Sequence, residues 1–184
     1  MTRNEALELL KKHLKNENLV KHCLAVEAVM VHLAKHFGED EEKWALAGLL
    51  HDIDYDYTKD DPEKHSLMGA EMLEKEGLPE DVVYAVKVHN ERHGLPRNSK
   101  MDKALYCTDP LTGLITAAAL IKPEKSLSVV KIKSLKKRFK EKAFAKGANR
   151  EIIAACSELD LSLEEFMTIG LKAMQGAADD LGLA

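Results

Sequence analysis

The feature that most constrains this chain is an apolar run that ends abruptly in a histidine and an aspartate. Residues 44–50 read Trp-Ala-Leu-Ala-Gly-Leu-Leu, and His51 and Asp52 follow at once. A helix that is apolar on all sides belongs in the centre of a fold. We therefore expect His51 and Asp52 to be buried at the end of a central helix. A buried carboxylate needs a partner, and a bound cation is one way to offset the cost of its burial.

Length and composition predict one globular domain that spans residues 1–184. The chain carries a formal net charge of −4, which suits an ordinary cytoplasmic protein. It contains no apolar run long enough to cross a membrane, and its first residues lack a secretory pattern. Cys23, Cys107 and Cys156 are far apart and odd in number, so we expect buried thiols rather than disulfides or a thiolate zinc site.

Helix signals recur along the chain, and strand signals are missing. Capping boxes, in which serine or threonine precedes an acid by three positions, start at Thr2, Ser99 and Ser162. Gly38 is placed to end a helix that begins near residues 16–18. Asp61-Pro62 predicts another helix start, with His65 inside that helix. The pattern favours an all-α fold.

Two further polar residues lie where the pattern leaves alternatives open. His22 shares the apolar stripe of the helix that ends at Gly38, and it is either a core histidine paired with a backbone carbonyl or a ligand. Asp109 precedes Pro110, so a kink or break in the helix is expected there. Asp109 then either points inward or caps the segment 111–121.

The order and spacing of His22, the His51-Asp52 pair and Asp109 resemble the signature of the HD superfamily of metal-dependent phosphohydrolases. The similarity is best between His22 and Asp109. It implies a compact multi-helix HD-domain bundle with a core at about residues 18–121. Additional C-terminal helices, at about residues 128–180, are expected to pack on that core.

The resemblance also implies a metal centre of one or two divalent ions, drawn from Mn, Fe, Ni, Co, Zn and Mg. The expected ligands of the first ion are His22, His51, Asp52 and Asp109. His65 and His89 look like the extra histidines of HD members that hold two metals, with Asp52 bridging the pair. Imidazole and carboxylate suit such ions, and a metal-bound water becomes a nucleophile near neutral pH.

Asp52 is therefore the expected catalytic residue, and Lys64 and Arg92 are expected to contact phosphate. The implied reaction is hydrolysis of a phosphate ester or anhydride of a nucleotide or another small phosphorylated metabolite. Where the branch that cleaves cyclic dinucleotides has Gly and Lys after its His-Asp pair, this chain has Asp54 and Tyr55, which speaks against that substrate.

Two other functions share the resemblance: an HD-fold di-iron oxygenase and a non-catalytic regulatory HD module. The basic segment 131–146 reads either as a solvated amphipathic helix or as an attractor of polyanionic substrates. Because the whole chain is acidic and shows no reader motif, we expect neither nucleic-acid nor membrane partners. The pattern does not specify an oligomeric state.

Overall fold

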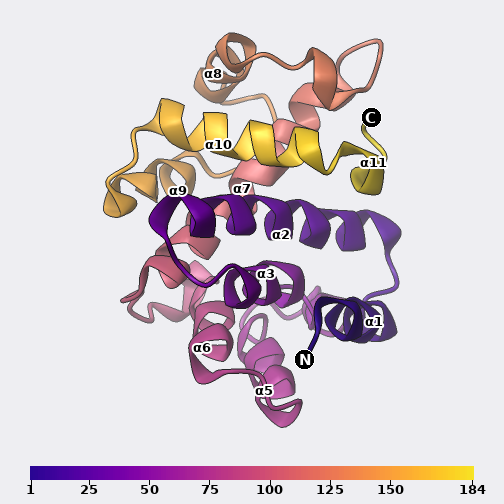
Figure 1. The fold of residues 1–184 in the computed structure, drawn as a ribbon, viewed down its shortest axis with the longest axis vertical. Coiled ribbons are helices and arrows are strands. Elements are labelled where there is room, and N and C mark those ends of the chain that lie inside the picture. The colour runs from indigo at the N-terminus through magenta and orange to yellow at the C-terminus, as the bar shows by residue number, and fades with distance from the viewer.

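The computed structural model describes residues 1–184, and all its regular elements are helical (Figure 1). The α-helices are α1 Arg3–His13, α2 Glu17–Phe37, α3 Glu41–Leu50, α4 Tyr55–Thr58, α5 Leu67–Lys75, α6 Glu80–Val88, α7 Lys100–Leu120, α8 Ile132–Lys140, α9 Arg150–Ala154, α10 Leu163–Gly176 and α11 Ala178–Leu181. Short 3-10 helices are η1 Glu91–His93, η2 Leu127–Val129 and η3 Ala155–Leu159. The all-α prediction is confirmed. None of the helices combines the length and apolarity needed to span a membrane.

The two longest helices, α2 and α7, form the frame of the molecule. Each has 21 residues, and α7 passes behind α2 and α10 in Figure 1. On one side of α2 lie α10 and then α8, and on the other side lie α3, α6 and α5. A single apolar cluster runs through these layers. All three cysteines are buried and unpaired, as expected.

Helix ends follow the local signals that the sequence carries. Capping boxes are present at Thr2, Ser99 and Ser162. α2 starts behind Asn16, whose side chain accepts the Asn18 N–H, and it ends at Gly38 in the left-handed conformation with a φ of 67°. These contacts lie within one turn of a helix, which is why sequence spacing predicts them.

A glycine fixes how closely α3 approaches α2. A Cβ added at Gly48 would lie 2.9 Å from both the backbone N and the Cα of Glu27. No side chain fits there without moving one helix away from the other. Gly48 therefore lets the carboxyl end of α3, just before His51, sit directly against α2.

One expected helix start is wrong, and one expected helix break does not occur. Asp61-Pro62 does not open a helix, because residues 62–66 form turns and α5 starts only at Leu67. Ser66 has a φ of 73°, which a right-handed helix cannot contain. Of the kink or break expected at Asp109, the break does not occur, since α7 is continuous through Pro110. The neighbouring Leu111 and Leu114 are fully buried, and this packing outweighs the hydrogen bond that proline removes.

Candidate metal centre

Six imidazole and carboxylate side chains meet at one place inside the bundle. They are His22 of α2, His51 and Asp52 directly after α3, His65 in the turn before α5, His89 at the end of α6 and Asp109 of α7. We call this set the cage. All six expected ligands are therefore brought together, although they are spread over 88 positions of sequence from residue 22 to residue 109.

One half of the cage surrounds the Oδ2 atom of Asp52. This oxygen lies 3.6 Å from Nε2 of His22 and 3.3 Å from Nε2 of His51. Oδ1 of Asp109 completes this half, at 3.0 Å from Nε2 of His22 and 3.8 Å from Nε2 of His51. We call His22, His51 and Asp109 the helix half, because α2, the end of α3 and α7 supply them.

The other half surrounds the Oδ1 atom of the same aspartate. This oxygen lies 3.3 Å from Nε2 of His65 and 3.5 Å from Nε2 of His89. We call His65 and His89 the turn half, since both lie where a helix starts or ends. Asp52 is thus shared, with one carboxylate oxygen directed at each half.

Hydrogen bonds on the far side of each ring fix which nitrogen faces the centre. Nδ1 of His51 donates to the Gly48 carbonyl at 2.8 Å, and Nδ1 of His89 donates to the Val86 carbonyl at 2.6 Å. A carbonyl can only accept, so in the neutral rings the proton sits on Nδ1 and the lone pair of Nε2 points into the cage. This is the arrangement that metal-binding histidines adopt.

For His22 and Asp109 the structure does not show the purely structural alternative. His22 is not paired with a backbone carbonyl, since its Nδ1 lies 3.3 Å from Oγ1 of Thr112 and its Nε2 faces the cage. Asp109 does not cap a helix, because it lies inside α7 and points toward His22 and His51. The continuous helix therefore aims Asp109 inward without a break.

The cage fits one or two divalent cations. Two groups of three donors, His22–His51–Asp109 and His51–Asp52–His89, each have their ligand atoms within 4.8 Å of one another. Nε2 of His89 is also buried without a hydrogen-bond partner, which is rare for a polar atom unless it binds something. Nitrogen and oxygen donors in this mixture suit Mn, Fe, Co, Ni and Zn.

The groups of the cage strongly perturb one another. Burial alone would raise the pKa of Asp52, but the His51 imidazole beside it holds that pKa well below its usual value. Burial would likewise lower the pKa of His65, yet Asp52 and Asp54 raise it to about 9. A cluster of imidazoles around carboxylates thus attracts positive charge, and a divalent cation can take the place of the protons.

Lys64 and Arg92 lie on the surface near the turn half. Nζ of Lys64 is 3.0 Å from Asp61, and Nη1 of Arg92 is 3.3 Å from Glu63. Both side chains are more than half exposed. Their contact with phosphate stays a prediction.

Sequence reasoning missed two residues behind the cage, Asp54 and Thr112. Asp54 is fully buried and contacts His65, and Thr112 contacts His22. Asp54 lies in the same acidic stretch as Asp52, which was a signal. Thr112 carried none, because it contacts a residue 90 positions away.

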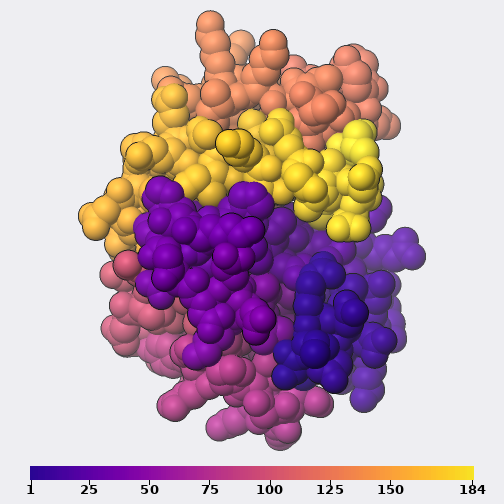
Figure 2. Space-filling view, in the orientation of Figure 1, coloured from indigo at the N-terminus to yellow at the C-terminus, as the bar shows by residue number.

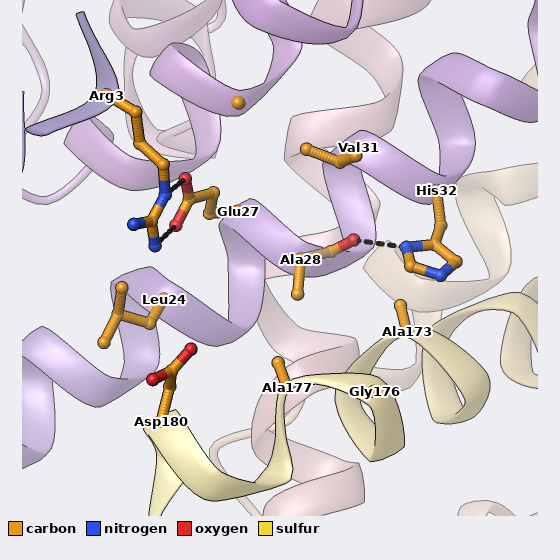
Figure 3. Close-up of a pocket in the computed structure, with 11 residues that line it drawn as sticks. Arg3, Leu24, Glu27, Ala28, Val31, His32, Ala173, Gly176, Ala177 and Asp180 are labelled. Atoms are coloured by element: carbon orange, nitrogen blue, oxygen red, sulfur yellow. Dashed lines mark hydrogen bonds and ion pairs between the residues drawn. The ribbon is translucent and has the colours of Figure 1, made fainter.

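A concavity lies beside α2, apart from the cage. Its volume is about 330 Å³, and it lies between α2, α10 and α11. Figure 3 shows the ion pair between Arg3 and Glu27 at its edge. This ion pair joins Nε of Arg3 to Oε1 of Glu27 at 2.5 Å and Nη2 to Oε2 at 2.9 Å. Small side chains such as Ala173 and Ala177 form the opposite wall. No cage residue lines it, so the two places are separate.

Comparison with known proteins agrees with the geometry. The model of the HD domain family matches residues 19–155, which include the whole cage. Ribonuclease Y of Oleidesulfovibrio alaskensis is 30% identical over 53% of this chain, but the match spans only 18% of that enzyme. Ribonuclease Y of Mycoplasma genitalium is 32% identical over 42% of this chain and 16% of its own length.

A relative nearer in size is the symmetrical bis(5'-nucleosyl)-tetraphosphatase of Halalkalibacterium halodurans. It is 30% identical, and the match covers 59% of this chain and 68% of that enzyme. The family model covers most of the chain, and the histidines and aspartates it includes converge in space. The chain therefore belongs to the HD domain family.

Proposed function

We propose that the protein is a metal-dependent phosphohydrolase that cleaves a phosphate ester or anhydride of a nucleotide or another small phosphorylated metabolite. The observation that carries this proposal is the position of Asp52. Its two oxygens face different pairs of imidazole nitrogens, at 3.3 to 3.6 Å. A carboxylate in this position can bridge two ions, and the similarity to a tetraphosphatase supports phosphate chemistry.

The residues of the chain have distinct roles in this reaction. The helix half would hold one ion, the turn half the other, and Asp52 would contact both. The bound metal supplies an acidified water and neutralises charge on the phosphoryl oxygens. Asp52 stays ionised because its pKa is held low. The bonds from Nδ1 of His51 and His89 to backbone carbonyls keep those rings in place.

An exposed aromatic ring beside the turn half supports a nucleotide as substrate. Tyr55 is 36% exposed, and its ring lies edge-on to His65 with the centroids 5.7 Å apart. Nucleobases stack on exposed aromatic side chains, and a base held there would place its phosphates near the cage. Lys64 directly precedes His65 and Arg92 follows His89 by three residues, so both could then exchange their acidic partners for phosphate oxygens.

RNA is a second candidate substrate, because several relatives are ribonucleases Y. The distribution of charge favours a small nucleotide. Of the 27 Lys and Arg residues, ten lie in residues 120–146 with only two acids. This basic segment forms one end of the molecule, and α10 lies between α8 and α2 (Figure 2). A polymer bound at the cage would need more cations nearby than Lys64 and Arg92.

The test is a screen of phosphorylated metabolites with the protein loaded separately with manganese, iron, nickel, cobalt, zinc and magnesium. We expect release of phosphate or of a nucleoside phosphate from a nucleotide with at least one metal. Cleavage of RNA alone would favour the second candidate. Oxygen uptake by anaerobically prepared iron protein would favour a di-iron oxygenase. A purified protein that binds no metal would indicate a regulatory module.

A further inference from the structure

Asp54 is a buried carboxylate that the proposed reaction does not use directly. Its side chain is fully inaccessible to solvent. Oδ2 accepts the backbone N–H of Ser66 at 2.8 Å and of Gly69 at 2.9 Å. Oδ1 lies 2.9 Å from Nδ1 of His65. Three donors from the turn before α5 and from its first residues therefore converge on one carboxylate.

The start of α5 depends on this carboxylate. Ser66 is in the position of the N-cap, but its side chain makes no capping hydrogen bond to the helix. Its hydroxyl donates instead to the Lys87 carbonyl at the end of α6. Asp54 thus provides from outside the acceptor that a capping side chain would normally supply. Gly69 makes room, since a Cβ there would lie 3.2 Å from Cγ of Asp54.

Asp54 also distinguishes His65 from the other three histidines of the cage. His51 and His89 are oriented by backbone carbonyls, and His22 lies against the hydroxyl of Thr112. Only His65 has a carboxylate behind it. An ionised carboxylate can only accept, so the hydrogen bond holds a proton on Nδ1, and in the neutral ring the lone pair of Nε2 is then directed at Asp52.

We propose that Asp54 is a positioning residue for the metal ion of the turn half. It selects the tautomer of His65 that can bind metal, and it holds the His65 ring in place. This inference rests on the proposed function, because it requires that the cage holds metal. Asp54 touches neither substrate nor ion and acts through His65. We therefore expect the charge and the hydrogen-bonding pattern of Asp54 to control how many metal ions the protein binds.

An isosteric substitution separates this role from the capping role. In Asp54→Asn, the amide oxygen can still accept the N–H groups of Ser66 and Gly69. The amide nitrogen then faces Nδ1 of His65 as a donor. A neutral His65 must accept on Nδ1 and carry its proton on Nε2, where it points at Asp52 and blocks metal. In this variant α5 should still start at Leu67, while His65 should no longer bind metal.

The experiment measures bound metal per chain by mass spectrometry after loading with Mn²⁺ and removal of excess ion. Asp56→Asn is the matched control, because Asp56 accepts the backbone N–H of Lys15 at 2.7 Å outside the cage. We expect about two ions in the wild type and in Asp56→Asn, and about one in Asp54→Asn. The double variant Asp54→Asn/His65→Ala should hold the same number of ions as His65→Ala, because Asp54 acts only through His65.

Two ions in Asp54→Asn, or one in the wild type, would overturn the inference alone. A wild type without metal would refute the proposed function as well, so the two failures are distinguishable. If Asp54→Asn loses its helical circular-dichroism signal, the tautomer of His65 is measured instead by long-range ¹H–¹⁵N spectra of the zinc-loaded wild type. We expect His65 to carry its proton on Nδ1 and to bind through Nε2, and the reverse assignment would overturn the proposal.

Discussion

The two halves of the cage are built by different means. The helix half rests on α2 and α7, the two longest helices, and on the close approach of α3 to α2 at Gly48. The turn half rests on α5 and α6, which have nine residues each, and on the turns beside them. There, hydrogen bonds to Asp54 and to the Val86 carbonyl fix the ligands. Hydrogen bonds orient histidines in both halves, but only the helix half is also supported by the two longest helices and by the close approach at Gly48.

This difference has a consequence for substitutions. A change that disturbs the helix half should cost both stability and metal, because the same packing serves both. A change to a ligand residue of the turn half should reduce metal binding or activity while the fold survives, since hydrogen bonds rather than a close helix contact orient these side chains. Five substitutions, taken from the largest expected effect to the smallest, test this contrast.

Asp52→Ala should remove metal from both halves, because each half uses one oxygen of Asp52. We expect bound metal to fall from about two ions to none and hydrolysis to become undetectable. The helical circular-dichroism signal should stay largely intact, because the surrounding core is apolar. Full activity in this variant would refute the metal-centred account.

His65→Ala and His89→Ala should each empty the turn half alone. Metal content should fall from about two ions to one, with the remaining ion in the helix half. Thermal unfolding in excess chelator should show little change for His65→Ala, whose side chain is 18% exposed. Unchanged stoichiometry in both variants would assign these histidines to the core or to substrate contacts.

Gly48→Ala should disturb the helix half through packing. The added Cβ meets the Glu27 backbone at 2.9 Å, and overpacking of this kind costs about 1–3 kcal/mol of unfolding free energy. Denaturant unfolding measures this loss. Gly113→Ala is the control, since nothing lies within 4 Å of a Cβ there and alanine favours a helix. Equal stability of the two variants would contradict the packing argument.

Tyr55→Ala should have the smallest effect and should depend on the substrate. Loss of base stacking should raise KM for a nucleotide about tenfold, with little change for p-nitrophenyl phosphate, which has no base. Tyr57→Ala is the matched control, because Tyr57 is 56% exposed and hydrogen-bonds to His13 away from the cage. A similar rise for both substrates would mean that Tyr55 supports the site rather than binding a base.

Much of the fold and of the ligand set was predictable from the chain. Capping boxes, the glycine after α2 and the apolar run before His51 are local signals, and each predicted a boundary or a burial that the structure has. The six expected ligands followed from a resemblance, and their spacing alone could not have shown that they meet. The false helix start at Asp61-Pro62 arose because a local pattern competes there with the hydrogen bonds of Asp54.

The sequence by itself determined where helices begin and end and which side chains could bind metal, because caps and periodicity involve residues within a turn or two of one another. Only the tertiary structure decided that Asp52 directs one oxygen to each half, that Asp54 backs His65 and that Thr112 backs His22. These contacts join helices that are distant in the chain. Their geometry depends on how closely the helices pack, and no pattern of neighbouring residues encodes it.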